Sequence, residues 1–258
     1  MEEIEPVFGA MGMDDFKPEY FMRYFDERSS KSSAKKDIKF LSVIFNWARA
    51  RGFMCIANPL TGITRQMKVK EGRDFYVTDE MFALVYDCAS PVIQDAIDLE
   101  YLTGQRPADV LRMRWDQVRD GSLWIEQGKT KARLQIAVEG ELSKLIDRIK
   151  SRGIVGMTLL ADPKGQQLKP FGYFRSQFDK ARDLAEKLAT ERGIEFTRFQ
   201  FKDLRAKSAS DMETMANARK LLGHSTESMT AKYVRSRVGE RVSPIQHSGY
   251  DKRDKSQS

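Results

Sequence analysis

The 258-residue sequence has few of the residues that build metal sites and disulfide frameworks. It contains only two cysteines, Cys55 and Cys88, and only two histidines, His224 and His247. Two cysteines cannot make a disulfide framework, and so few soft or imidazole ligands argue against a zinc site. We therefore expect no structural metal and no metal cofactor.

Long apolar runs are also missing. No stretch approaches the ~20 apolar residues that a membrane-spanning helix needs. The N-terminus is acidic and lacks the charged-then-apolar pattern of a signal peptide. The sequence shows no internal repeat, and its one low-complexity tract is the polar tail of residues 251–258. These features predict a soluble, cytoplasmic protein without a membrane partner.

Positive charge is plentiful and unevenly placed. The chain carries 44 Lys and Arg against 37 Asp and Glu, for a net charge of +7. Residues 1–27 have a net charge of −6, whereas residues 28–73 have a net charge of +9. A basic block of this size in a folded segment predicts a polyanionic partner, although a merely solvated helix face is the alternative on charge alone.

Helical patterns dominate the N-terminal part. Glycines and acidic residues favour a loop over residues 1–17, and Pro18 opens a short helix over 18–28. A longer helix over 34–51 is capped by Ser32 or Ser33 and ends at Gly52. Its apolar residues recur at helical spacing and predict a buried face made of Ile38, Leu41, Ile44, Phe45 and Ala48.

The same helix has a basic and polar stripe. Lys35, Lys39, Asn46 and Arg49 fall on a side that differs from the apolar one. Because basic side chains along a helix suit a nucleic-acid backbone, we expect Lys35, Lys39 and Arg49 to face DNA.

Further elements follow the basic block. Thr78 caps a helix over 79–89, Pro91 interrupts it, and Gly104 ends the next helix over 92–103. Alternating apolar residues predict a strand-turn-strand unit over 123–138. Helices then fill 141–150 and 171–191.

The region from Phe199 to Tyr233 gathers four side chains suited to phosphate chemistry: Lys202, Arg205, His224 and Tyr233. A phosphoryl-transfer transition state spreads negative charge over non-bridging oxygens, and a guanidinium can bind two of them at once. A phenol can attack phosphorus and hold the broken end covalently. A lone tyrosine on a helix is more often a packing residue, so the prediction depends on the spacing of the whole set.

The pattern around His224 predicts a helix, a turn and a second helix. Gly223 ends the first helix, and Ser225 or Thr226 caps the second. Met229 is then expected to point inward from a short helix that ends near Tyr233.

A second chemically informative stretch is Thr103–Asp109. Gly104 permits a sharp turn, and Pro107 suits the first position of a new helix, so Arg106 is fixed at a rigid corner. Asp109 could pair with this arginine or orient a neighbouring catalytic group. A structural ion pair at a helix start is the alternative interpretation.

These segments together resemble one protein family. Arg205, the sequence LLGHS around His224, and Tyr233 nine residues later resemble the second sequence box of tyrosine recombinases, above all phage integrases of the lambda type. The segment TGQRPAD matches the family's TGxRxxE/D box, and EQGKT matches its hairpin lysine segment. Asn58-Pro59-Leu60 is similar to the end of the family's core-binding domain.

The resemblance implies an α+β fold that is mainly α with a small antiparallel β-sheet. It implies a truncated helical core-binding domain over residues 1–63, a linker over 64–74, and a catalytic domain with a C-terminal tail over 75–258. An arm-binding domain and the first core-binding helix are not recognisable, so the chain is either naturally short or a fragment. Val238, Val242 and Ile245 could dock the tail on a neighbouring protomer, although a loose tail fits equally well.

In this family a tyrosine attacks the scissile phosphate and forms a 3′-phosphotyrosine. The 5′ hydroxyl that is released later attacks the partner duplex. The resemblance assigns the nucleophile to Tyr233, the binding of non-bridging oxygens to Arg106 and Arg205, and a further hydrogen bond to His224. It implies neither a metal nor a nucleotide cofactor.

The hairpin lysine of the family protonates the leaving 5′ oxygen. The resemblance places Lys129 in this role, with Lys131 as the fallback. Tyr173 and Arg175, at the exposed start of the helix over 171–191, are candidate phosphate contacts, with plain surface residues as an equal alternative.

Lys202 departs from the family pattern, which has a histidine three residues before the second arginine. An ordinary lysine is protonated at neutral pH and cannot accept the tyrosine proton. We favour a role for Lys202 as an electrostatic clamp on the phosphate. A role as a base, and an inactive relative, are the alternatives.

The predicted function is site-specific recombination that integrates or excises DNA in a bacterial host cell. The expected partners are double-stranded DNA with attachment-type sites, three further protomers that complete a homotetramer, and a host DNA-bending factor. The alternatives are a type IB topoisomerase-like or dimer-resolving activity, and a DNA-binding regulator without catalysis.

Overall fold

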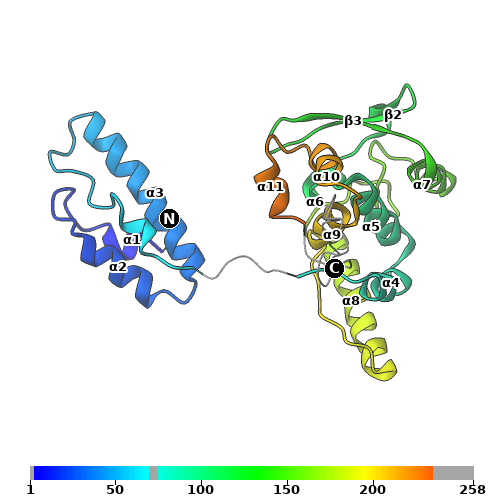
Figure 1. Cartoon of the computed structure of the whole chain (residues 1–258), viewed down its shortest axis with the longest axis horizontal. Coiled ribbons are helices and arrows are strands. Elements are labelled where there is room, and N and C mark those ends of the chain that lie inside the picture. The colour runs from blue at the N-terminus through cyan, green and yellow to red at the C-terminus, as the bar shows by residue number, and fades with distance from the viewer. Residues whose placement is uncertain (1–2, 70–74, 235–258) are drawn as a thin grey trace, which may run out of the picture. The chain divides into compact units, whose positions relative to one another are not determined.

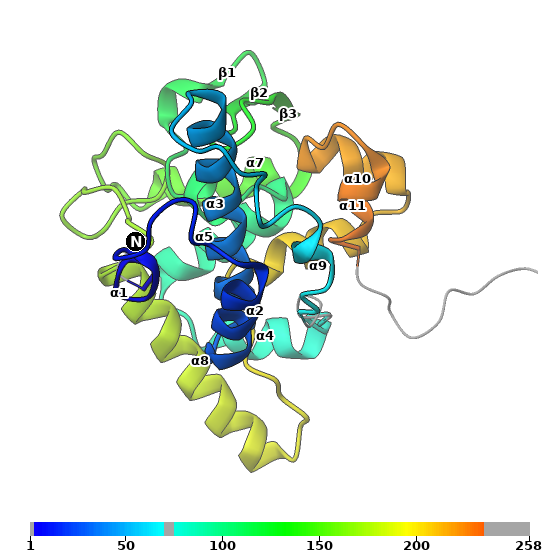
Figure 2. The same ribbon diagram turned by 90° about the vertical axis from the view of Figure 1, so that its left-hand side faces the viewer.

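The computed structural model describes residues 3–69 and 75–234. The chain divides into two compact units, Met1–Asp74 and Phe75–Ser258. Figure 1 shows the elements of both units, and Figure 2 shows the same ribbon turned by 90°. None of the helices in the described residues is long and apolar enough to span a membrane.

The first unit is built on α3 (Lys31–Ala50), against which α2 (Pro18–Glu27) packs. Pro18 opens α2 as predicted. The predicted cap of α3 was wrong, because the helix starts earlier: Ser30 is the N-cap, and its hydroxyl accepts a hydrogen bond from the Ser33 amide at 3.4 Å.

Residues 3–17 are more ordered than their composition predicted. They contain the short helix α1 (Glu5–Phe8), and Phe8 and Phe16 are buried. The Phe16 ring stacks on Phe21 at 5.6 Å and meets the edge of Phe45 at 5.0 Å between centroids. The buried rings of Phe8 and Phe16 therefore anchor this segment to the core of the first unit, although its sequence has no helical periodicity.

The buried face of α3 contains Ile38, Leu41, Phe45 and Ala48, as predicted, but not Ile44, which is 36% exposed. Ile44 lies beyond the edge of the buried stripe. Lys39 and Arg49 are exposed. The Lys35 ammonium instead donates to the Met67 carbonyl of its own unit.

The segment after α3 packs back onto it. The Asn58 amide nitrogen donates to Ser42 Oγ and to Asn46 Oδ1, each at 2.9 Å, while its oxygen accepts from the Leu60 amide. A 3₁₀ turn follows at Ile63–Arg65, and Met67 is fully buried. Residues 64–69 of the expected linker thus pack with the first unit, and residues 70–74 lie outside the described residues.

The second unit holds a layer of helices and one small sheet. Its first helices are α4 (Asp79–Asp87), α5 (Pro91–Thr103) and α6 (Pro107–Val110), followed by a 3₁₀ turn at Trp115–Gln117. The Thr78 hydroxyl caps α4 by accepting from the Met81 amide at 3.2 Å, as expected. Pro91 opens α5, which ends at Gly104 with φ +61°.

The sheet consists of β1 (Val118–Arg119), β2 (Ser122–Glu126) and β3 (Arg133–Ala137), paired antiparallel in that order. Leu123 lies opposite Ile136, and Ile125 lies opposite Leu134. Figure 1 shows β2 and β3 running side by side along the upper edge of the second unit. The described elements confirm the predicted α+β class, mainly helical with a small antiparallel sheet.

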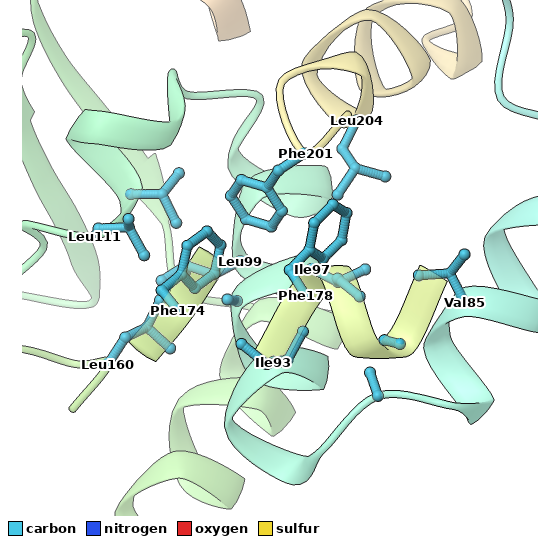
Figure 3. Close-up of a cluster of buried hydrophobic side chains, with 14 of the residues drawn as sticks. Val85, Ile93, Ile97, Leu99, Leu111, Leu160, Phe174, Phe178, Phe201 and Leu204 are labelled. Atoms are coloured by element: carbon cyan, nitrogen blue, oxygen red, sulfur yellow. The ribbon is translucent and has the colours of Figure 1, made fainter. Parts of the chain in front are cut away.

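The remaining helices are α7 (Gly140–Ser151), α8 (Tyr173–Arg192), α9 (Asp203–Asp211), α10 (Met215–Leu222) and α11 (Glu227–Ala231). The core of this unit lies among α4, α5 and α8. Figure 3 shows its centre, where Phe174 and Phe178 of α8 meet Phe201 and Ile97. Helix α9 packs on α5, and α10 packs on both α9 and α11 (Figure 2).

Candidate active site

Arg205 is a large charged side chain buried in the second unit, with only 2% of its surface exposed. It projects from α9. One guanidinium nitrogen donates to the Gly104 carbonyl, and NH2 donates to the Leu222 carbonyl at 2.9 Å. Burial, and then the nearby charge of Arg106, lower the pKa of Arg205 to about 10. The group therefore stays charged at neutral pH and joins the α5–α6 turn to the end of α10.

His224 follows the left-handed Gly223 that ends α10. Its Nε2 lies 3.1 Å from Arg205 NH2, and its Nδ1 lies 3.1 Å from Thr230 Oγ1. Because a guanidinium has no acceptor, Nε2 must accept, and the proton of the neutral ring is on Nδ1. Burial, and then the charges of Arg205 and Arg106, lower the pKa of His224 to about 4.

This pairing bears on the expected role of His224. Donation to a phosphate through Nε2 requires a proton on that atom, and here Nε2 accepts from Arg205. His224 must therefore exchange its partner, or move its proton, before it can donate to a bound phosphate. The donating role stays a prediction.

Tyr233 lies two residues beyond α11, with its half-buried ring against Ala209, Ala218 and Leu222. The Arg205 guanidinium carbon is 5.2 Å from the centre of its ring. The His224 ring centre is 5.1 Å away, with the two planes at 45°. Three residues from the predicted set thus meet at one point.

Helix α11 presents a different side chain to the interior than expected. Met229 is 36% exposed, whereas Thr230 is fully buried. The Thr230 hydroxyl contacts His224 Nδ1, which explains why a polar residue takes the inward position. The prediction that Met229 points inward was wrong.

Arg106 occupies the corner predicted for it. It precedes α6 with φ −70° and ψ 148°, and Pro107 is the first residue of the helix. Its NH1 donates to Gln127 Oε1 at 2.8 Å but lies 4.0 Å from Asp109 Oδ2. The main partner of Arg106 is therefore an amide, and its ion pair with Asp109 is long.

Asp109 forms its hydrogen bonds with groups other than Arg106. Its Oδ1 accepts from Arg112 NH2 at 2.6 Å and from the Gly128 amide at 3.0 Å. Gly128 directly precedes Lys129 in the hairpin turn. Of the two roles open for Asp109, these bonds favour the orientation of the neighbouring turn.

Lys129 is exposed at the turn between β2 and β3. It lines a groove of about 450 Å³ together with Arg106, Arg112 and Lys169. The hairpin is irregular beyond this point, since Lys131 has φ +58° and its amide donates to the Gln127 carbonyl at 2.9 Å. Lys131 is exposed and is absent from the described lining of the groove.

Lys202 is exposed immediately before α9 and lines an adjoining pocket of about 210 Å³. Pro107 and Arg175 line the same pocket, and Arg175 Nε donates to Asp179 at 2.8 Å. Leu111 and Pro170 line both this pocket and the Lys129 groove, so the two hollows adjoin. Tyr173 is 40% exposed at the start of α8.

A larger groove of about 650 Å³ lies elsewhere on the second unit. Trp124 and Arg133 line it, and none of the described lining residues belongs to the predicted catalytic set. Within residues 3–69 and 75–234, no cluster of three His, Cys, Asp or Glu side chains is arranged to hold a metal ion.

The sequence interpretation missed the buried amides of Gln105 and Gln127. Both side chains are fully buried, and the Gln127 Nε2 donates to Gln105 Oε1 at 2.8 Å. A signal was present for Gln127, because it continues the inward alternation of Leu123 and Ile125. A polar residue at such a position needs hydrogen-bond partners inside the protein.

The family model described as "Phage integrase family" matches residues 76–240 of this chain. The integrase of Escherichia phage HK022 is 32% identical over 225 residues, and that of Escherichia phage lambda is 30% identical over 223 residues. Each match covers 81% of this chain and 60% of the relative. The chain thus spans about 60% of the length of these curated relatives.

Solved structures of lambda integrase share the fold. A dimer of its residues 75–356 bound to a COC′ core site has a TM-score of 0.73 at 24% identity, covering 95% of this chain and 88% of that chain. A tetramer bound to a Holliday junction has a TM-score of 0.74 at 24% identity, covering 94% and 73%. The family match contains Arg106, Arg205, His224 and Tyr233 and extends over more than half of the sequence, so the chain belongs to the phage integrase family.

Proposed function

We propose that this chain is a site-specific DNA recombinase that cleaves and rejoins strands through a 3′-phosphotyrosine on Tyr233. The observation that carries the proposal is the meeting of the Arg205 guanidinium, the His224 imidazole and the Tyr233 phenol ring, with separations of 5.1 to 5.2 Å from the tyrosine ring. Family membership supports this choice over a topoisomerase-like enzyme or a regulator without catalysis.

In the proposed reaction, the Tyr233 oxygen attacks the scissile phosphorus and the bond from phosphorus to the 5′ oxygen breaks. The phenol proton leaves to solvent, which reaches the half-buried side chain. Lys129 donates a proton to the departing 5′ oxygen. In the rejoining step, a 5′ hydroxyl attacks the phosphotyrosine and returns its proton to Lys129, while the bond from phosphorus to the Tyr233 oxygen breaks and the phenolate takes a proton from solvent.

Electrostatic stabilisation is assigned to the cations of the site. Arg106 and Arg205 bind the non-bridging oxygens, where negative charge is concentrated in the transition state. A pKa of about 10 leaves Arg205 charged at neutral pH despite its burial. Lys202, in the adjoining pocket, acts as a clamp on the phosphate and not as the base.

The proposed partners are double-stranded DNA with attachment-type sites, three further copies of the chain and a host DNA-bending factor, in the bacterial cytoplasm. Lambda integrase structures bound to a core site and, as a tetramer, to a Holliday junction support DNA binding and assembly. The exposed Lys39 and Arg49 of α3, and Lys131, Tyr173 and Arg175 in the second unit, are the proposed additional DNA contacts. The bond from Lys35 to Met67 makes Lys35 the weakest member of this set.

The test mixes the full chain with supercoiled DNA from its own source in excess chelator and stops the reaction with detergent. We expect relaxed circles and protein joined to 3′ ends. Tyr233→Phe should abolish both, whereas the control Tyr20→Phe, which changes a tyrosine of the first unit, should retain both. An adduct that survives in Tyr233→Phe, or one joined to 5′ ends, contradicts the proposal.

A further inference from the structure

Gln127 stands where β2 leads into the hairpin turn, and its side chain is fully buried. Its Oε1 accepts from Arg106 NH1 at 2.8 Å and from Thr130 Oγ1 at 2.6 Å. Its Nε2 donates to Gln105 Oε1 at 2.8 Å and to the Leu222 carbonyl at 2.9 Å. A neutral amide offers two lone pairs and two N–H groups. Every one of them is used.

The chemistry of the partners fixes which way the amide points. A guanidinium can only donate, and a backbone carbonyl can only accept. The Gln127 oxygen must therefore face Arg106, and its nitrogen must face Leu222. An exchange of the two amide atoms would lose both bonds, so this side chain has one stable orientation.

The Leu222 carbonyl connects this amide to the second arginine. It accepts from Gln127 Nε2 at 2.9 Å and from Arg205 NH2 at 2.9 Å. Arg106 and Arg205 are therefore joined through one amide and one carbonyl. The Thr130 hydroxyl connects the same amide to the turn that carries Lys129.

The surroundings leave Gln127 little freedom. Gln105 is buried behind it, and Gln105 Nε2 donates to the Thr103 and Leu221 carbonyls at 2.8 Å each. A Cβ atom added at Gly223 would lie 2.9 Å from Gln127 Nε2, closer than real contacts of this kind. The glycine before His224 therefore also makes room for the amide.

We propose that Gln127 is a positioning residue for strand cleavage: its buried amide fixes Arg106 relative to Arg205 and to the turn that carries Lys129. It acts through Arg106 and does not touch the substrate. Its effect on cleavage rests on the proposed recombinase function. Its effect on the order of Arg106 rests on the hydrogen bonds alone.

Two substitutions separate the parts of this role. Gln127→Met keeps a similar side-chain length and removes all four hydrogen bonds. Gln127→Glu keeps the acceptors for Arg106 and Thr130 but turns an oxygen toward the Leu222 carbonyl. If Gln127 served only as an acceptor for Arg106, Glu would be an adequate or better replacement. The positioning role predicts that both variants are defective.

The first measurement is single-turnover cleavage of target DNA by the full chain. We expect Gln127→Met and Gln127→Glu to cleave about a hundredfold more slowly, because a reacting group misplaced by about 1 Å costs a factor of that order. DNA affinity should remain within about threefold, since the change is confined to the geometry of the cleavage step. The control Gln135→Met, which removes a bond from Gln135 to Ser122 in the same hairpin, should cleave normally.

A double variant tests whether Gln127 acts through Arg106. Residues that act as one unit are not additive, so Gln127→Met should slow an Arg106→Ala enzyme by less than about threefold. A further loss of about a hundredfold in that background would mean independent action, since independent effects add. That result would overturn the inference.

The second measurement does not depend on activity. Nitrogen-15 relaxation of the Arg106 Nε–H group reports the order of its guanidinium in the free protein. We expect lower order in Gln127→Met and Gln127→Glu than in the wild type and Gln135→Met. Unchanged Arg106 order would overturn the positioning role. If Arg106 order is lost in the variants but neither the wild type nor any variant cleaves DNA, the recombinase proposal is overturned, and only the inference that Gln127 orders Arg106 stands.

Discussion

Arg205 and His224 share a hydrogen bond, and burial lowers the pKa of both. At physiological pH, Arg205 is nevertheless charged and His224 is neutral. The pKa of Arg205, lowered to about 10, stays well above neutrality. The pKa of His224, lowered to about 4, lies well below it. The site therefore offers fixed cations beside a neutral imidazole, and a neutral imidazole can both accept and donate a hydrogen bond.

The buried neutral His224 predicts a loss of stability in mild acid. Its folded pKa of about 4 lies below the ordinary histidine pKa of 6.5, so the unfolded chain binds more protons between these values. The contribution of neutral His224 to the unfolding free energy is fully present above pH 6.5 and is lost as the pH falls toward 4. Between pH 7 and pH 5 the wild type should lose about 1–2 kcal/mol more of its unfolding free energy than His224→Gln.

Urea unfolding of both proteins at the two pH values measures this difference. Other titrating groups are common to both chains and cancel in the comparison. Equal losses in the wild type and in His224→Gln would show that His224 is not held neutral by its surroundings.

Lys129 is predicted to protonate the leaving oxygen, and this role has a chemical test. A 5′-thio leaving group needs no proton because a thiolate is a far better leaving group than an alkoxide. Lys129→Ala should therefore cut cleavage of ordinary DNA by about 10²–10⁴-fold, the usual contribution of a general acid, and recover most of the rate on 5′-thio DNA.

Lys131→Ala is the matched control, because Lys131 is exposed in the same turn but outside the described groove lining. Because Lys131 is also a proposed DNA contact, its loss should lower cleavage of both substrates by the same factor, so 5′-thio DNA should restore no rate. Recovery on 5′-thio DNA by Lys131→Ala, and not by Lys129→Ala, would reassign the acid.

Among the secondary-structure elements, those with strong local signals were predicted best. Thr78, Pro18 and Gly104 mark helix boundaries through side-chain or backbone chemistry that acts within a few residues, and the structure has them in these places. Ser30 was missed because serines stand at positions 29, 30, 32 and 33, and local sequence does not choose among them. The order of residues 3–17 depends on Phe16 meeting Phe45, a contact between distant positions.

The N-cap of α3 gives a testable prediction about a single helix. Removal of an N-cap hydroxyl costs about 1 kcal/mol, so Ser30→Ala should speed hydrogen exchange of the first α3 amides about fivefold if they open locally. Ser32→Ala, which changes an exposed serine without a capping bond in the described structure, is the control. Equal exchange in the wild type and Ser30→Ala would contradict the capping role.

The candidate site was also predictable only in part. The chemistry of Arg106, Arg205, His224 and Tyr233 follows from residue type and spacing, and the structure brings the last three into contact. The buried amide of Gln127 depends on an exact meeting of three segments that are far apart in sequence. Spacing along the chain does not encode that meeting, so only the inward alternation of β2 hinted at it.

For the whole molecule, the two compact units divide between Asp74 and Phe75, at the end of the expected linker over 64–74. The proposed catalytic residues all lie in the second unit, within the family match over residues 76–240, while residues 28–73 carry a net charge of +9. The expected docking residues Val238, Val242 and Ile245 lie outside the described residues.

The most direct test of the central claim identifies the residue that becomes joined to DNA. The full chain is incubated with target duplexes whose cleaved strand diffuses away, and the trapped adduct is digested and sequenced by mass spectrometry. The account predicts a peptide with a 3′-linked nucleotide on Tyr233, and no such peptide from Tyr233→Phe. A nucleotide on another residue, or one linked through its 5′ phosphate, would contradict the account.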